Sequence, residues 1–175
     1  MWNHRLPPQN LTYEADNRNE EEITNDFREQ ANALNPYIDF FYFDVLSSIK
    51  EFKCGIKAIK EFKKPYLIGI HISEGTNLPS GEKISKIRDV IDDKVLGVML
   101  SCVSPENYEA NFREVKSLGV PFGFKLNGFI TTKPNPSYTE NYLKSKTGNP
   151  IEVMRKRKDL TPKNMAVIVK KFKNA

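Results

Sequence analysis

The sequence of 175 residues contains only two cysteines, two histidines and one tryptophan. Two cysteines cannot build the disulfide framework of a small secreted protein. The longest apolar stretches, at residues 40–43 and 95–100, are far shorter than the roughly 20 residues that a membrane-spanning helix needs. The first residues also lack the apolar region of a signal peptide. We therefore expect a soluble protein of the cytoplasm with no membrane partner.

Glycine-rich phosphate loops are also missing. Neither G-x-G-x-x-G nor G-x-x-x-x-G-K-[ST] occurs anywhere in the chain. These two motifs place backbone N–H groups around the phosphates of dinucleotides and nucleotides. Their absence argues against a Rossmann or P-loop nucleotide-binding domain.

Positive charge is in modest excess, with 27 Lys and Arg against 22 Asp and Glu, a net charge of +5. Such a balance is compatible with a non-catalytic basic module that binds nucleic acid. However, Lys50, Lys53, Lys57 and Lys60 recur opposite the apolar residues of one predicted helix. That pattern is typical of the solvated face of an amphipathic helix. We therefore expect no nucleic-acid partner and keep the basic module as an alternative.

Hydrophobic residues make up 39% of the chain, which is enough for the core of one domain. Apolar, strand-like segments alternate with segments of helical periodicity. Ser104 followed by Pro105 predicts one helix start, and Asn19 followed by three glutamates predicts another. The expected strands lie at residues 1–6, 38–44, 66–73, 95–102 and 120–127. The expected helices lie at 19–34, 48–64, 81–93, from 104 onward, and at 161–175, where Met165, Ile168, Val169 and Phe172 have the spacing of a core face.

Strands that alternate with helices at this spacing are βα units, and they predict an α/β fold with a parallel sheet. The residues alone leave open a doubly wound sheet or a (β/α)8 barrel. The chain begins with a short strand and ends on a helix, so the pattern is incomplete at both ends. We expect a piece of a longer fold.

Polar side chains stand at the carboxyl end of each later strand, where parallel α/β folds place their functional groups. These residues are Asp44, Ser73, Cys102 and Asn127. Cys102 is the most informative, because a thiolate at a strand end can bind zinc or act as a nucleophile. Neither Cys54, in the middle of a helix, nor His71, within a strand, is an expected metal ligand.

Lys125 gives a rival chemistry, because it lies near the end of the strand at 120–127. A desolvated lysine inside a barrel can form a Schiff base with a carbonyl substrate. A lysine-dependent aldolase therefore stays open as an alternative function.

Several stretches in order resemble the homocysteine S-methyltransferase family. Leu6-Pro7-Pro8 is similar to the family's segment after its third strand, and Gly97 to Cys102 followed by Ser104-Pro105-Glu106 is similar to its G-x-N-C strand and the helix that follows. Asn127-Gly128 matches the asparagine at the end of its seventh strand. The resemblance implies that residues 1–175 are a partial (β/α)8 TIM barrel of about four to five βα units, truncated at both ends.

The resemblance also implies a reaction. Members of this family transfer a methyl group from a sulfonium or ammonium donor to the thiolate of homocysteine, which gives methionine. The thiolate is bound to Zn²⁺ held by three cysteines, and the metal keeps the sulfur deprotonated at neutral pH. By this match Cys102 is one zinc ligand, Asp44 contacts the substrate ammonium, and Ser73 and Asn127 line the substrate site.

The chain departs from the family pattern at several of these positions. Asp44 replaces a glutamate, Val45 a threonine, Ser101 an asparagine and Leu126 a proline. The other two zinc ligands belong to a Gly-Gly-Cys-Cys motif that does not occur in the sequence. We therefore expect the chain by itself to be inactive.

Overall fold

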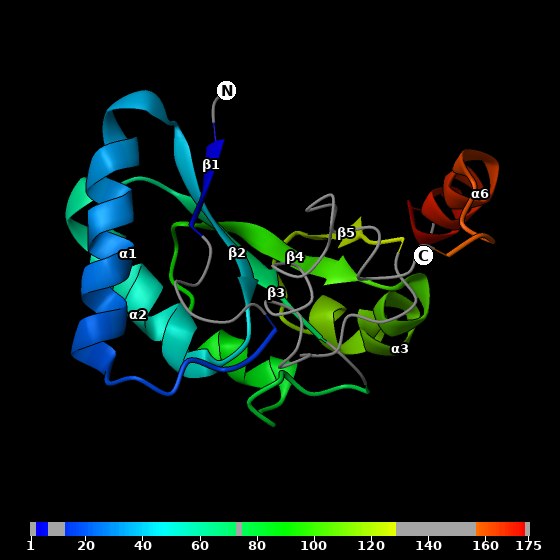
Figure 1. Ribbon diagram of the computed structural model, residues 1–175, viewed down its shortest axis with the longest axis horizontal. Coiled ribbons are helices and arrows are strands. Elements are labelled where there is room, and N and C mark those ends of the chain that lie inside the picture. Colours follow the sequence, from blue (N-terminus) through cyan, green and yellow to red (C-terminus); the bar gives the residue numbers. More distant parts are fainter. Residues whose placement is uncertain (1–2, 7–12, 73–74, 129–156, 174–175) are drawn as a thin grey trace, which may run out of the picture.

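The computed structural model describes residues 3–6, 13–72, 75–128 and 157–173. Five parallel strands form one sheet in the order β1-β2-β3-β4-β5 (Figure 1). The strands are β1 (Asn3–Leu6), β2 (Phe40–Leu46), β3 (Tyr66–Ile70), β4 (Val95–Val103) and β5 (Phe122–Leu126). Strands that follow one another in both sequence and space are typical of a (β/α)8 barrel, whereas doubly wound sheets reverse their strand order. The predicted α/β fold is confirmed as a partial TIM-like barrel.

The α-helices occupy the predicted positions between and after the strands. They are α1 (Glu20–Leu34), α2 (Ile49–Ile59), α3 (Pro105–Lys116) and α6 (Pro162–Lys173), and short 3-10 helices lie at η1 (Asn35–Tyr37), η2 (Lys60–Phe62) and η3 (Ile84–Asp89). None of the helices in the described part of the chain has the length and apolar character needed to cross a bilayer.

Two helix starts follow the sequence prediction closely. The Asn19 side chain accepts a hydrogen bond from the Glu22 backbone N–H, and the Glu22 carboxylate accepts one from Asn19 N–H. The Ser104 hydroxyl caps α3 by accepting from Asn107 N–H, with Pro105 at the first helical position. Both caps satisfy backbone donors that a helix end leaves free.

Aromatic side chains fill the layer between the sheet and α1 and α2. Phe43 of β2 packs edge-on against Phe27 of α1 and against Tyr66 of β3. Gly55 of α2 faces the same ring, since a Cβ there would lie 2.6 Å from Cε1 of Phe43. The close approach of α2 to β2 therefore depends on this glycine.

Two helical predictions were wrong in detail. The segment at 81–93 forms only the 3-10 helix η3, in which Ile84 and Ile87 are both fully buried. A spacing of three matches the 3-10 period, so this segment buries its apolar pair without a full α-helix. In α6, Phe172 is buried but Val169, predicted in the core, is 40% exposed.

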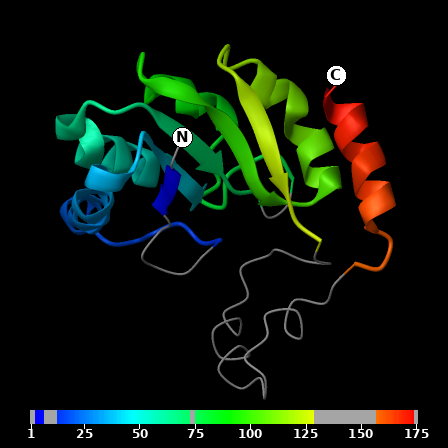
Figure 2. The same ribbon diagram turned by 90° about the horizontal axis from the view of Figure 1, so that it is seen from above.

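Helix α6 packs against α3 and against Phe124 of β5. The Phe172 ring lies 4.3 Å from that of Tyr108, and Lys171 Nζ lies 2.6 Å from a carboxylate oxygen of Glu109. Figure 2 shows α6 beside α3 at the β5 side of the sheet. One face of α6 is thus packed while the rest stays accessible.

Candidate functional site

Side chains from β2 and β4 meet across β3. The hydroxyl groups of Tyr42 and Ser101 are hydrogen-bonded to each other and buried. Gly69 of β3 lies between them, and a Cβ there would be 2.8 Å from Ser101 Oγ and 3.0 Å from Cε2 of Tyr42. The missing side chain at Gly69 allows the two polar groups to meet.

Asp44 and Lys125 form an ion pair at the carboxyl ends of β2 and β5. Lys125 Nζ lies 2.7 Å from both carboxylate oxygens of Asp44. The Asp44 side chain is 5% exposed and that of Lys125 is 33% exposed. The ammonium also lies 5.9 Å from the centre of the Tyr42 ring, within range of a cation–π interaction. The nitrogen that a Schiff-base mechanism would need is thus held in an ion pair with Asp44.

The backbone is left-handed at one non-glycine residue near the end of each of two strands. Val45 of β2 has a φ of 63° and Cys102 of β4 a φ of 57°. At both places the pairing register shifts, between Phe43 and Leu46 and between Ser101 and Val103. A β-bulge of this kind changes the direction in which a side chain points. The left-handed conformation itself costs conformational energy at a residue that has a Cβ.

The bulge determines where the Cys102 thiol lies. Simple alternation predicts that Cys102 shares a face with Val98 and Leu100, which are fully buried in the core. That prediction is wrong, because Cys102 is only partly buried and its Sγ lies 2.9 Å from the Tyr13 hydroxyl. The left-handed φ turns the thiol toward the segment that precedes α1.

Asn127 holds the backbone of this bulge. Its Nδ2 donates to the Cys102 carbonyl at 2.6 Å, and its N–H donates to the Val103 carbonyl at 2.9 Å. Asn127 is 6% exposed. The structure therefore brings together two of the predicted site residues, Cys102 and Asn127.

His71 is fully buried, and its Nδ1 donates to the Ser101 carbonyl at 3.3 Å. The Tyr13 ring lies 4.2 Å from the imidazole. The imidazole is thus buried with a hydrogen-bond partner and an aromatic contact inside the protein. Tyr13 therefore contacts both His71 and Cys102.

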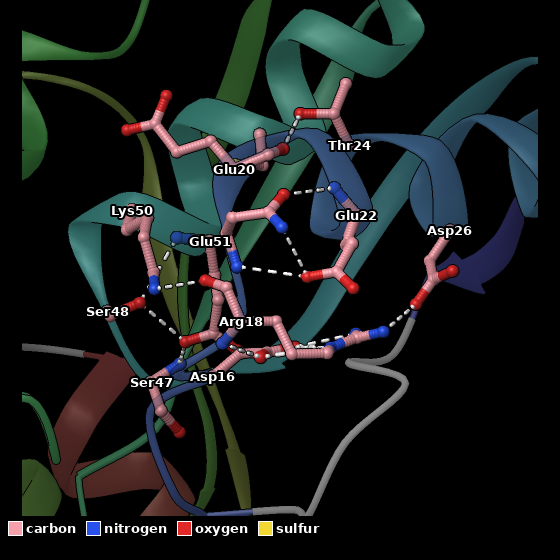
Figure 3. Close-up of polar contacts among 12 residues, drawn as sticks. Asp16, Arg18, Glu20, Glu22, Thr24, Asp26, Ser47, Ser48, Lys50 and Glu51 are labelled. Atoms are coloured by element: carbon pink, nitrogen blue, oxygen red, sulfur yellow. Dashed lines mark hydrogen bonds and ion pairs between the residues drawn. The ribbon is translucent and has the colours of Figure 1, made fainter.

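The segment that carries Tyr13 is fixed by charged groups (Figure 3). Arg18 pairs with Asp16 at 2.8 Å and with Asp26 at 2.6 Å, and both carboxylates raise the pKa of its guanidinium. Lys50 of α2 donates to the Arg18 carbonyl at 2.8 Å. These contacts tie residues 16–18 to α1 and α2, three to five positions after Tyr13.

Glu51 is a fully buried carboxyl group next to this segment. Its Oε2 accepts from the Ser48 hydroxyl at 2.7 Å and from the Ser47 N–H at 3.2 Å. Burial raises the pKa of Glu51 to about 7, although these hydrogen bonds oppose the change. No sequence pattern distinguishes this glutamate, because it lies in an ordinary amphipathic helix.

The described residues do not form a zinc site by themselves. The resemblance implies three thiolate ligands. Cys102 is the one candidate for such a ligand among the residues that the structure describes. No group of three His, Cys, Asp or Glu side chains suited to a metal ion lies within residues 3–6, 13–72, 75–128 and 157–173. Cys54 is buried between α1 and α2, where its thiol donates to the Glu20 carbonyl at 3.5 Å. Ser73 lies outside the described residues.

The sequence matches one known protein family along almost its whole length. The model described as homocysteine S-methyltransferase matches residues 4–175. The chain belongs to the homocysteine S-methyltransferase family. No curated protein sequence matches this family member significantly.

Solved structures agree with this assignment at the level of the fold. The metallated form of the homocysteine methyltransferase MmuM from Escherichia coli superposes with a TM-score of 0.60 at 14% identity, over 83% of this chain and 48% of that protein. The oxidized form gives a TM-score of 0.61 with the same identity and coverage. This homocysteine S-methyltransferase family chain thus spans about half the length of these proteins.

Sequence reasoning missed the partners of two predicted site residues in this family member. The strand-end position of Lys125 suggests a Schiff-base lysine but does not indicate its pairing with Asp44. Tyr13 entered no prediction of the site, although it lies against Cys102. Alternation puts Lys125 on the same strand face as Asn127, close to the strand end. An acidic partner among the other strand-end residues, such as Asp44, is therefore the contact that the sequence could have indicated.

Proposed function

We propose that residues 1–175 form part of a barrel that transfers a methyl group to homocysteine. Homocysteine reacts as the thiolate, after its thiol proton has been released to solvent. The thiolate sulfur forms a new bond to the methyl carbon, while the bond from that carbon to the positive sulfur or nitrogen of the donor breaks. The donor leaves as a neutral thioether or amine, and the product is methionine. The observation that carries this proposal is the Cys102 thiol, turned by a left-handed residue at the carboxyl end of β4 and partly accessible.

Asp44 is proposed as the contact for the substrate ammonium. Its carboxylate already holds one ammonium, that of Lys125, at 2.7 Å from each oxygen. Binding of homocysteine then requires that the substrate amino group share the Asp44 carboxylate with Lys125 or displace Lys125 from it. Ser73 and Asn127 are proposed to line the same site, and Asn127 also fixes the Cys102 carbonyl at 2.6 Å.

Zinc enters the proposal only through Cys102. The described residues provide one of the three thiolates that the resemblance implies, so we assign no reaction step to the metal. We further propose a cytoplasmic protein whose partners are small molecules, with no nucleic-acid or membrane partner.

The test is methionine formation by the protein that contains this chain, with S-methylmethionine and with betaine as donors. Cys102→Ser is expected to abolish turnover with either donor. Asp44→Asn is expected to raise KM for homocysteine about tenfold or more with a smaller effect on kcat, since it weakens ground-state binding. Lys116→Gln, on the outer helix α3, is the control and should keep full activity. Undiminished turnover by Cys102→Ser would refute the proposal.

A separate measurement addresses the chain by itself. Residues 1–175 are expected to bind no stoichiometric zinc and to show no turnover, because Cys102 lacks thiolate partners among the described residues. One equivalent of zinc per chain, lost in Cys102→Ser, would contradict this expectation.

A further inference from the structure

A cavity of about 350 Å³ lies between α2 and η3. Its apolar lining includes Ile56 and Ile59 of α2, Val90 after η3, and Tyr66 at the start of β3. The volume falls within the range of small-molecule sites. Both α2 and η3 belong to the described part of the chain. The residues that line the cavity are therefore present without the further strands of a complete barrel.

Lysines gather around this cavity. It is lined by Lys53, Lys57, Lys60, Lys64 and Lys94, which come from α2, η2 and the segments before β3 and β4. The sequence pattern predicts a solvated helix face for the lysines between residues 50 and 60. The structure divides that face, because Lys50 donates to the Arg18 carbonyl while Lys53, Lys57 and Lys60 line the cavity.

Two carboxylates, those of Asp89 and Asp92, also line the cavity, and each has a contact within the chain. Tyr66 donates its hydroxyl to Asp92 at 3.0 Å, and the Lys94 backbone N–H donates to the same carboxylate oxygen at 3.0 Å. Asp89 lies 3.8 Å from Lys86, which does not line this cavity. Lys64 donates to the Ile38 carbonyl at 2.8 Å and to the Asn35 carbonyl.

Four ammonium groups are left without a carboxylate partner among the residues that the structure describes: those of Lys53, Lys57, Lys60 and Lys94. Lys53 and Lys57 are four residues apart on one helix, and Lys57 and Lys60 are three apart. Like charges at these spacings repel one another and disfavour the helix. A bound polyanion would remove this repulsion, since phosphate oxygens accept hydrogen bonds from several ammonium groups at once.

The cavity lies at the opposite end of the strands from Asp44 and Cys102. Tyr66 is the first residue of β3 and Lys94 directly precedes β4, whereas Asp44 and Cys102 lie near the carboxyl ends of their strands. A ligand here would therefore not occupy the proposed methyl-transfer site.

We infer that this cavity binds a small molecule with a diphosphate group and an apolar part. The phosphates contact Lys53, Lys57, Lys60 and Lys94, and the apolar part lies on Ile56, Ile59 and Val90. A concave site of this volume favours a small ligand over a nucleic acid, which needs an extended positive groove and aromatic stacking platforms.

Calorimetric titration of the protein with ADP and with inorganic pyrophosphate tests the inference. ADP is expected to bind at one equivalent and more tightly than pyrophosphate, because only ADP covers the apolar surface. The double variant Lys57→Gln/Lys60→Gln is expected to weaken ADP binding about tenfold or more. Lys163→Gln/Lys170→Gln, on exposed positions of α6, changes the net charge equally and should bind ADP as the unaltered protein does. All four lysines are exposed, so both variants are expected to fold.

Three results would overturn the inference. The first is no saturable ADP binding at concentrations up to about 1 mM. The second is an equal loss of affinity in both double variants, which would indicate general electrostatic attraction. The third is tighter binding of a single-stranded oligonucleotide than of ADP, which would make the lysines part of a nucleic-acid surface.

Discussion

Lys125 Nζ lies 2.7 Å from both carboxylate oxygens of Asp44, although the two residues are 81 positions apart in the sequence. The pair joins β2 to β5 across two intervening strands. Asp44 is almost completely buried, whereas a third of the Lys125 side chain is exposed. Removal of Lys125 and removal of Asp44 should therefore lower the unfolding free energy by different amounts.

Lys125→Met is expected to destabilise the chain more than Asp44→Asn does. The first change leaves a buried carboxylate without its ammonium, which costs about 3 kcal/mol in unfolding free energy. The second leaves a lysine that can extend to solvent, and we expect a loss of about 1 kcal/mol. Denaturant unfolding measures both, and the double variant should recover part of the loss. Equal losses in the two single variants would contradict this account of the pair.

Gly69→Ala is expected to destabilise the chain by about 2 kcal/mol. A Cβ at this position would lie 2.5 Å from the Phe43 carbonyl oxygen and 2.8 Å from Ser101 Oγ, and the backbone oxygen cannot rotate away. Gly128→Ala is the matched control, because a Cβ there has no neighbour within 4 Å. Chemical denaturation of the two variants checks the prediction, which fails if they lose the same stability.

The two thiols should differ in reactivity. Cys54 is 1% exposed, and burial raises the pKa of its thiol, so little nucleophilic thiolate is available. Cys102 is partly exposed beside Tyr13. Iodoacetamide followed by mass spectrometry is expected to modify Cys102 in the folded chain and Cys54 only after unfolding. Tyr13→Ala should accelerate modification of Cys102 several-fold, whereas comparable rates at the two cysteines would refute the assigned burial.

Glu51 should make the stability depend on pH. Burial raises its pKa from 4.5 to about 7, so the folded chain holds this proton over a range in which the unfolded chain has lost it. The unfolding free energy should therefore fall as pH rises from about 4.5 to about 7, by roughly 3 kcal/mol at most. Glu51→Gln should remove this slope.

The control for Glu51 is Glu61→Gln. Glu61 is exposed, and its contact with Arg28 is 4.0 Å long, so its loss should leave the slope unchanged. Unfolding curves at several pH values between about 4 and 8 measure both variants. A slope that persists in Glu51→Gln would show that other groups cause it.

The sequence by itself determined the order of the elements and most of their ends. Apolar periodicity marks the strands and helices, and Asn19, Ser104 and Pro105 mark helix starts, because these signals act over a few neighbouring residues. The segment at 81–93 was the exception, because an apolar pair three residues apart fits both a 3-10 turn and an α-helix. The strand-end positions of Asp44, Cys102 and Asn127 could be read in the same local way.

Only the tertiary structure decided what these strand-end residues contact. The backbone is left-handed at Val45 and Cys102, but neither residue is a glycine, so the sequence contains no sign of this conformation. Simple alternation therefore predicts the wrong direction for the Cys102 side chain. The pairs Asp44–Lys125 and Tyr13–Cys102 join positions 81 and 89 residues apart. Likewise, the lysines of α2 became part of a cavity only where η3 and Lys94 pack beside them. Local sequence fixes backbone conformation over a few residues, whereas contacts at such separations depend on how the strands align in the sheet.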